Sequence, residues 1–118
     1  MARYSCVTQL SGSAEQLQEE IRHLLERCRL NILHNSHDYW VAGEPPGHKP
    51  FNQLVTVEVL MNWKHREPSH VEVTCIAKNE ELPLKSTNHC QQTFQQIESE
   101  LNQLQNQLQL AGSRPDHL

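Results

Sequence analysis

Aromatic side chains are scarce in this sequence of 118 residues, at 5% of the total. Apolar residues of all kinds make up 36%, which is low for a globular protein and predicts a thin hydrophobic core. A chain of this length folds as one domain, because two separate cores would each be too small to be stable. We therefore expect a single α+β domain over residues 1–110 and a flexible tail over residues 111–118, where the apolar periodicity stops.

Long apolar runs and clustered positive charges are also missing. No stretch approaches the roughly 20 apolar residues that span a bilayer, and the N-terminus lacks the apolar run of a secretory signal. The net charge is -4, and the longest basic run is Lys64-His65-Arg66. Nucleic acids and anionic membranes both need a concentrated basic surface. We expect a soluble cytoplasmic protein that neither binds nucleic acid nor inserts into a membrane.

Paired cysteines are absent as well, since no Cys-x-x-Cys occurs. The cysteines lie far apart, each inside an expected helix or strand, and they are Cys6, Cys28, Cys75 and Cys90. Without redox or metal spacing, we interpret all four as small buried hydrophobic residues of a reducing compartment.

Catalytic and metal-binding motifs are missing too, although eight histidines are present. His34 and His37 are three residues apart in an expected turn, without a His-Glu-x-x-His partner, so we predict no metal site. His89 and Cys90 are neighbours on a helix and point about 100° apart, which disfavours a thiol–imidazole pair. The paired acids at 19–20 and 80–81 lie on a solvated helix face and a linker, and the glycines form no phosphate-binding loop. We expect no enzyme activity and no cofactor.

The hydrophobic pattern predicts two helices. Ser13 and Gln16 form a capping box. Apolar residues then recur on one helical face at Leu17, Ile21, Leu24, Leu25 and Cys28. A second, longer helix spans roughly 88–108, and its apolar seam is Phe94, Ile97, Leu101, Leu104 and Leu108.

The strands follow from alternation and turns. A strand over 3–10 ends at Ser11-Gly12-Ser13, and residues 30–33 and 39–41 form a hairpin around the turn 35–38. Residues 43–50 are a loop because they hold three prolines. Two long strands, 55–63 and 71–78, should pair antiparallel across a turn near 67–69, with Val55, Val57, Val59, Met61 and Trp63 buried on the first. In the following linker, Pro83 forces an extended path, and Leu82 and Leu84 are expected to tuck under it.

The order β-α-β-β-β-β-α predicts an antiparallel sheet of four to five strands with both helices on one face. This layout resembles a reduced form of the helix-grip architecture of START and Bet v 1-type lipid-binding domains, a likeness of arrangement only. A ferredoxin-like sandwich is the alternative.

Two surfaces are candidates for function. The first holds aromatic and proline side chains that could line a ligand groove or a protein interface, namely Tyr39, Trp40, Pro45, Pro46, Phe51 and Trp63. The second is the polar back of the C-terminal helix, where amides outnumber charges and only Glu98 and Glu100 are acidic. That back admits a helix-to-helix contact in a homodimer, although only about two heptads are present, and we expect the apolar seam to pack on the sheet.

Three segments carry a resemblance to a known family. The runs Leu54-Val55-Thr56-Val57-Glu58-Val59-Leu60, Lys78-Asn79-Glu80-Glu81-Leu82-Pro83-Leu84 and Asn88-His89-Cys90-Gln91-Gln92 resemble a family of small uncharacterised cyanobacterial proteins. The resemblance carries no known activity and implies at most a cytoplasmic role in a photosynthetic bacterium, beside a membrane or pigment complex.

The function that we expect is a non-enzymatic accessory module that binds another protein. A carrier of a small apolar ligand, held between the sheet and the C-terminal helix, is the second hypothesis. An enzyme that depends on a metal or a thiol is the third, and it requires His34, His37 or His89 to converge with an acid or a thiol.

Overall fold

The computed structural model describes residues 1–47, 49–64, 70–82 and 88–113, with the backbone alone for 110–113. Its elements in chain order are β1 (Ala2–Ser11), α1 (Ala14–Arg27), β2 (Asn31–Asn35), β3 (Tyr39–Gly43), the short 3-10 helix η1 (Phe51–Gln53), β4 (Thr56–Lys64), β5 (His70–Asn79) and α2 (His89–Ser113). This is the predicted order with η1 added, so the α+β fold is confirmed.

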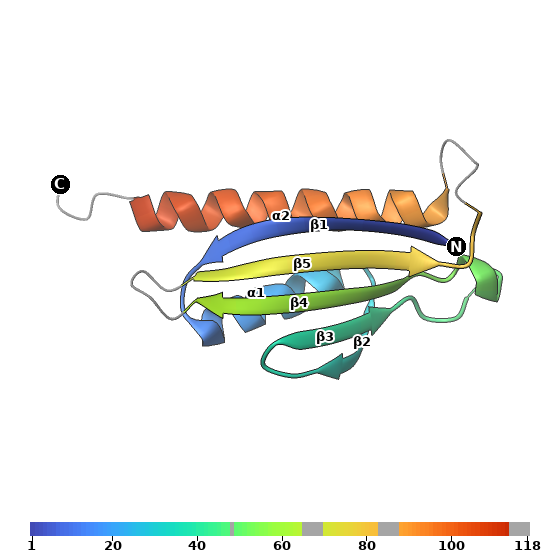
Figure 1. Cartoon of the computed structure of the whole chain (residues 1–118), viewed down its shortest axis with the longest axis horizontal. Coiled ribbons are helices and arrows are strands. Elements are labelled where there is room, and N and C mark those ends of the chain that lie inside the picture. The colour runs from blue at the N-terminus through green and yellow to red at the C-terminus, as the bar shows by residue number, and fades with distance from the viewer. Residues whose placement is uncertain (48, 65–69, 83–87, 114–118) are drawn as a thin grey trace.

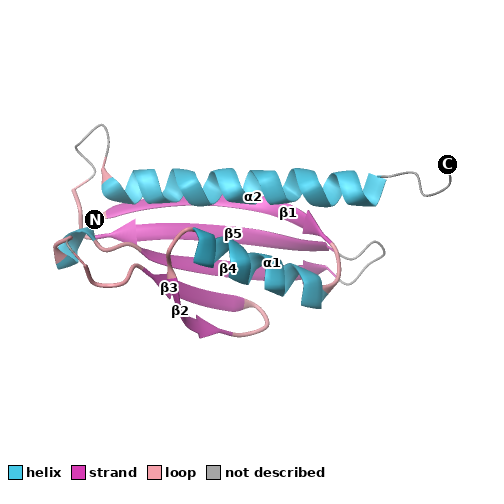
Figure 2. Cartoon of the chain, turned by 180° about the vertical axis from the view of Figure 1, so that it is seen from behind, coloured by secondary structure: helices cyan, strands magenta, loops and turns pink. Residues whose placement is uncertain are grey.

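The strands form one antiparallel sheet in the order β1-β5-β4-β3-β2 (Figure 1). Both helices lie on the same face, with α2 along β1 and β5, and α1 crossing the middle strands (Figure 2). We call the covered side the inner face and the other side the outer face. The layout is the predicted reduced helix-grip arrangement. The ferredoxin-like alternative is excluded because its β-α-β-β-α-β order differs.

Helix α1 begins and ends with defined caps. The Oγ of Ser13 accepts a hydrogen bond from the backbone N–H of Gln16 at 3.2 Å, which confirms the predicted N-cap. At the other end Arg29 has φ of 62°, in the left-handed region where glycine is the usual residue. The backbone N–H of Leu30 donates to the carbonyl of Leu25 at 3.1 Å, which closes the helix end. The chain then turns directly into β2.

The two long central strands show the predicted alternation. Val57, Val59 and Met61 of β4 are buried on the inner face, and they pair with Ala77, Cys75 and Val73 of β5. The residues between them face outward and are half-buried or exposed. The turn expected near 67–69 lies outside the described residues.

The β2–β3 hairpin also forms as predicted, and it carries a bulge. The pairing shifts between Ile32 and His34, so Leu33 is the extra residue of β2. The side chain of Leu33 reaches the outer face, because a Cβ added at Gly43 would meet its Cδ1 at 3.2 Å. Thus β2 is a short, bulged strand at one edge of the sheet.

Helix α2 packs its apolar seam into the core. Its predicted seam is buried at Phe94, Ile97, Leu101 and Leu104 and half-buried at Leu108. The ring of Phe94 stacks on Tyr4 of β1 at 5.8 Å between centroids. The helix is longer than predicted and reaches Ser113, because its amide-rich sequence contains no proline before position 115. Residues 111–113 are therefore helical instead of a tail. No helix of the described chain is long and apolar enough to cross a membrane.

One prediction about the linker is wrong. Leu82 is 66% exposed and does not tuck under the chain, because side chains of the strands and of α2 already fill the core. Pro83 and Leu84 lie outside the described residues.

Replacing Leu101 with alanine tests the packing of α2 on the sheet. Leu101 is 2% exposed, and removing a buried leucine side chain typically costs about 3 kcal/mol. We expect Leu101→Ala to lower the free energy of unfolding by that amount in urea denaturation. Gln95→Ala, on the exposed face of the same helix, is the control and should change stability by less than about 0.5 kcal/mol. Equal effects would show that α2 does not pack as described.

Candidate functional site

The candidate site surrounds the loop that joins β3 to β4, residues 44–55, of which all but residue 48 are described. Glu44 begins this loop, and its backbone N–H donates to the carbonyl of Val55 at 3.0 Å. Its carboxylate oxygen Oε1 accepts the backbone N–H of Val55 at 2.8 Å, and both oxygens lie 2.8 Å from Nε2 of His89. The two side chains are only 18–19% exposed. Glu44 therefore closes the loop on itself and fastens it to the first residue of α2.

The N-terminus of α2 is capped from two directions. The Oδ1 of Asn88 accepts the backbone N–H of Gln91 at 2.7 Å, and its Nδ2 donates to the hydroxyl of Tyr4 at 2.7 Å. Glu81 accepts the backbone N–H groups of Cys90 at 3.0 Å and His89 at 3.4 Å. These contacts satisfy helical N–H groups that have no partner within the helix.

The charge of Glu81 is stabilised in this position. Burial alone would raise the pKa of Glu81, but hydrogen bonds from Asn79 and from the backbone of Cys90 and His89 outweigh it. The pKa of this carboxyl therefore lies below its ordinary value.

A second tether holds the far part of the loop. The Nδ2 of Asn79 donates to the carbonyl of Gln53 at 3.1 Å and to Glu81 at 2.6 Å, and the backbone N–H of Glu80 donates to the carbonyl of Asn52 at 3.2 Å. These bonds fix η1 against the end of β5. Its first residue, Phe51, remains 85% exposed. The backbone here is thus anchored by hydrogen bonds, while the aromatic side chain that it carries is exposed to solvent.

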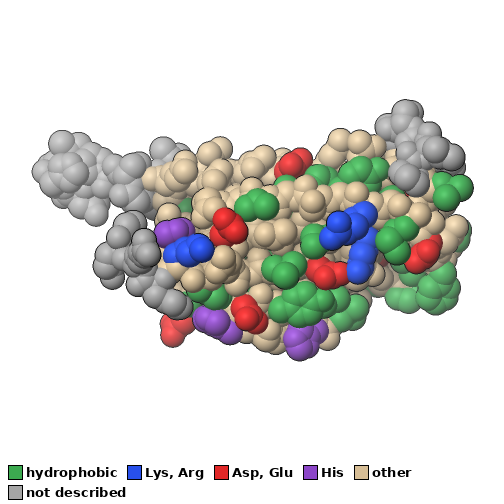
Figure 3. Space-filling model, in the orientation of Figure 1, with side chains coloured by type: hydrophobic (Ala, Val, Ile, Leu, Met, Phe, Trp, Pro, Cys, Tyr) green, Lys and Arg blue, Asp and Glu red, His purple; other side chains and the backbone are tan. Residues whose placement is uncertain are grey.

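Beside Phe51 lies a pocket of about 350 Å³ on the outer face of the sheet, which we call the Phe51 pocket. Its floor is formed by Gly43, which has no side chain, and by the neighbouring Thr56 of β4. Apolar side chains form much of its wall, namely Met1, Leu33, Phe51 and Leu54. Figure 3 shows apolar side chains gathered at this end of the molecule. Met1, Leu33 and Phe51 are each more than 60% exposed. The pocket therefore has an apolar rim that is accessible to solvent.

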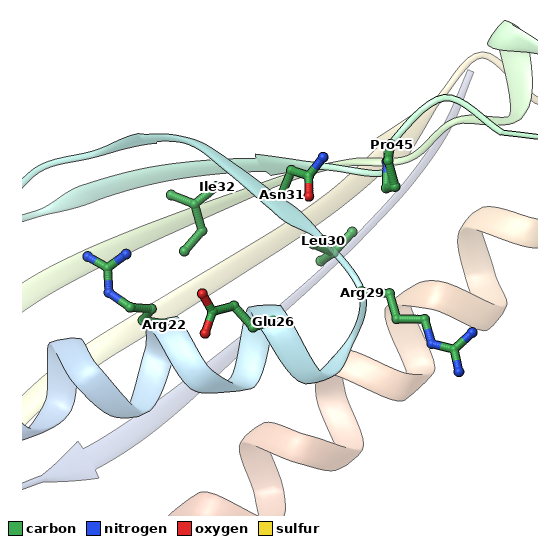
Figure 4. A pocket seen from close by; sticks show the side chains of 7 residues that line it. All are labelled: Arg22, Glu26, Arg29, Leu30, Asn31, Ile32 and Pro45. Atoms are coloured by element: carbon green, nitrogen blue, oxygen red, sulfur yellow. The ribbon is translucent and has the colours of Figure 1, made fainter.

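On the other side of the loop a groove of about 740 Å³ separates α1 from β2, which we call the α1–β2 groove. Leu30 and Ile32 supply its apolar part, while charged side chains come from α1. Arg22 and Glu26 extend from the helix toward β2, whereas Arg29 turns away toward α2 (Figure 4). The guanidinium of Arg22 lies 5.2 Å from the ring centroid of Trp40, which orients it.

A smaller hollow of about 200 Å³ connects these two. It shares Arg29 and Pro45 with the α1–β2 groove, and Glu44 and Leu54 with the Phe51 pocket. The three hollows therefore adjoin around the 44–55 loop. None of them is lined by a described residue of α2, and the seam of α2 is buried against the sheet.

The six residues predicted as a binding surface do not form one group. Pro45, Pro46 and Phe51 are exposed at the loop, where Pro45 lines two of the hollows and Phe51 lines the third. Trp63 lies at the other end of β4, stacked on His37 at 5.1 Å.

Tyr39 and Trp40 are neighbours in β3 and face opposite sides of the sheet. The hydroxyl of Tyr39 donates to Glu58 at 3.2 Å on the outer face. The ring of Trp40 is buried on the inner face, and its Nε1 has no hydrogen-bond partner among the described residues. The predicted binding surface thus includes three residues of the loop, but it also includes residues of the strands and of the core that lie away from the loop.

The histidines do not assemble a metal site in the described part of the chain. Within it, no group of three histidine, cysteine, aspartate or glutamate side chains is placed to hold a metal ion. His34 and His37 are exposed in the β2–β3 hairpin. His89 meets Glu44, yet its neighbour Cys90 is fully buried beneath the helix.

The thiols are held in their neutral form. Burial, reinforced by nearby carboxylates, raises the pKa of Cys28 and of Cys90 to about 11. Burial also raises the pKa of Cys75 and of the half-buried Cys6. A nucleophilic cysteine needs a lowered pKa and access to its substrate, so none of these thiols has the properties of a catalytic group.

Sequence reasoning missed the residues that build the site. Glu44 and His89 are 45 positions apart, and the sequence pattern places Glu81 only in a linker. One local signal was present at Asn79. An asparagine side chain can accept a hydrogen bond from the backbone N–H two residues later, and here the N–H of Glu81 donates to Oδ1 of Asn79 at 3.0 Å.

No family model and no curated protein matches this chain. Among solved structures, an uncharacterised protein from Bacillus thuringiensis covers 91% of this chain and 98% of its own with a TM-score of 0.65, at 10% sequence identity. A protein from Deinococcus radiodurans has 14% identity, coverage of 93% and 99%, and a TM-score of 0.47. One from Thermus thermophilus has 10% identity, coverage of 95% and 99%, and a TM-score of 0.43. The first likeness confirms the fold, and identities this low say nothing of function.

The lowered pKa of Glu81 predicts a pH dependence of stability. A carboxyl with a depressed pKa stabilises the fold above its unfolded pKa, and this contribution is lost as pH falls through the folded pKa. We expect Glu81→Gln to be less stable than the native protein at pH 7 and to lose less further stability between about pH 5 and pH 3. Thermal unfolding across this range checks it. The exposed neighbour Glu80→Gln should follow the native curve, and parallel curves for Glu81→Gln would contradict the assignment.

Thiol labelling tests the buried cysteines. With Ellman's reagent at about pH 8, we expect Cys28, Cys75 and Cys90 to react only after unfolding, and Cys6 to be the first to react in the folded protein, because it is the most accessible of the four. The time course in buffer is compared with that in guanidinium chloride. Fast labelling of Cys90 in the folded state would restore the thiol-enzyme hypothesis.

Proposed function

We propose that the protein is a non-enzymatic accessory module that binds another protein through the Phe51 pocket. The observation that carries this proposal is the exposed Phe51, held by tethers on both sides of the loop beside an apolar pocket. An exposed phenylalanine lowers solubility and does not stabilise the isolated protein, because its side chain is not packed in the core. Large aromatic side chains and small apolar pockets are the features that dominate binding energy in protein interfaces.

The anchoring of the loop supports the same proposal. Binding costs less when the contact residues are already fixed, because little conformational entropy is then lost. Glu44, Asn79 and His89 hold the loop through side-chain hydrogen bonds at 2.8–3.1 Å. These tethers fix the position of η1, and through it the base of the Phe51 side chain.

The packing of α2 favours this function over the apolar-ligand carrier. A carrier of this kind needs space between the sheet and α2, whereas in the described structure the seam of α2 and the inner residues of β1, β4 and β5 are buried together in one cluster. The hollows near the loop lie outside that layer.

Two substitutions test the proposed function. Phe51→Ala removes the exposed ring, and Gly43→Val fills the floor of the pocket while the backbone keeps its conformation; the nearest atom, Leu33 Cδ1, belongs to an exposed side chain that can move. We expect each variant to weaken binding of the native partner at least about tenfold. The measurement is quantitative capture by immobilised protein from cells that make it, followed by mass spectrometry.

Val7→Ala is the matched control, since Val7 is 60% exposed on β1, far from the loop along the sheet order. Proteins retained by the native chain and by Val7→Ala, but lost from both pocket variants, support the function. Identical sets of retained proteins from all four baits would refute it. Thermal unfolding of each variant shows whether it is folded.

A further inference from the structure

The two edges of the sheet differ in how they are covered. At one edge, α2 runs along β1, and the Nε2 of Gln105 donates to the backbone carbonyl of Gln9 at 3.0 Å (Figure 1). At the other edge, β2 pairs with β3 alone, and no described element lies beyond it in either view (Figures 1 and 2). An uncovered edge presents backbone N–H and C=O groups to which an extended segment can bind as a further strand.

Hollows lie beside β2 on both faces of the sheet. On the outer face, Leu33 is part of the Phe51 pocket. On the inner face, Ile32 lines the α1–β2 groove. Successive side chains of a strand point to opposite faces. A strand added along β2 therefore directs alternate side chains toward the pocket and toward the groove.

The chemistry of the two hollows is different. The pocket has apolar side chains in much of its wall, together with the polar residues Glu44, Lys78 and Glu80. The groove is lined by Arg22 and Glu26, which extend toward β2, and by Arg29 at its end, whose guanidinium turns away toward α2. Arg22 has an acidic partner only in the exposed Glu19 among the described residues, at 3.8 Å, which leaves its guanidinium available for a carboxylate in the two-pronged geometry that arginine favours.

We propose that the partner binds as a sixth strand along the free edge of β2, with apolar side chains over the Phe51 pocket and acidic side chains over the α1–β2 groove. This inference rests on the proposed function, and it names the mode of recognition and the partner's sequence pattern: a segment in which apolar and acidic residues alternate. The backbone of the edge supplies affinity, and the two hollows select the side chains.

A second copy of the chain fits this edge less well. The strand β2 reads Asn31-Ile32-Leu33-His34-Asn35 and holds no acidic residue. Two copies joined through β2 would therefore place no carboxylate opposite Arg22. Charge complementarity favours a different, acidic strand.

Synthetic peptides test the proposed recognition directly. The probe is an eight-residue peptide of alternating valine and glutamate with blocked ends, and the control replaces glutamate with lysine. We expect the glutamate peptide to bind at least about tenfold more tightly by fluorescence anisotropy. On binding, backbone amides of Asn31–Asn35 should become protected from hydrogen exchange. Equal binding of both peptides, or binding without protection of β2, overturns the inference.

Charge variants of the groove provide the second measurement. Arg22→Glu should weaken the glutamate peptide at least about tenfold and reduce the preference over the lysine peptide. Arg29→Gly keeps the fold, because glycine suits the left-handed backbone at this position. It removes a guanidinium that turns away from the groove, so it should bind the glutamate peptide as the native protein does and should raise the melting temperature. Lys64→Glu, at the other end of β4, is the matched control and should bind as the native protein does. Unchanged binding in Arg22→Glu overturns the inference.

The outcomes separate this inference from the proposed function. If Phe51→Ala loses the cellular partner while β2 shows no protection by peptide or partner, the interaction module stands and strand addition is wrong. If β2 is protected in the peptide-free protein in a concentration-dependent manner, the edge joins two copies and the acidic-strand proposal is wrong. If the glutamate peptide protects β2 but binds Phe51→Ala with unchanged affinity, the role of the Phe51 pocket is wrong, and with it the proposed pattern.

Discussion

The contact between Glu44 and His89 is the interaction on which the surface of this protein depends. It joins the residue that follows β3 to the first residue of α2, and the same carboxylate binds the backbone of Val55. The loop between β3 and β4 is therefore closed, and its residues that line the three hollows are held in position. A partly buried histidine beside a carboxylate usually suggests acid–base chemistry. Here both groups are engaged in holding the chain, and the adjoining thiol of Cys90 is buried and neutral. The pair is best understood as a positioning device.

Most of the fold could be predicted from the sequence, because its signals are local. The N-cap at Ser13, the alternation of Val57 and Val59, and the seam of α2 each require only the residues near them. The site could be predicted only in part. The proline-rich loop and Phe51 were identified from composition, but Trp40 and Trp63 were grouped with them although one is buried and the other stacks on His37 at the far end of β4. The contacts that build the site connect residues far apart in the chain, and periodicity carries no information about such pairs.

The binding features arise where the fold leaves space. Gly43 has no side chain, which opens the floor of the Phe51 pocket on the outer face. The sheet ends at the short strand β2, which leaves an edge unpaired in the described structure and a groove between that edge and α1. The amide-rich back of α2 is not near these hollows. The helix instead runs along the opposite edge of the sheet. One edge is thus covered by α2 and the other is open, and the open edge is the one to which we propose that a partner strand adds.

The central claim is that the end of the molecule around Phe51 contacts another protein in the cell. Site-specific photo-crosslinking measures this directly, with benzoylphenylalanine introduced at Phe51 in cells that make the protein, and at Val7 for comparison. Both positions are exposed in the isolated chain. The account predicts discrete crosslinked products from position 51 that are absent or much weaker from position 7, and that disappear when Gly43→Val is added. Equal products from both positions, or none from position 51, would contradict it.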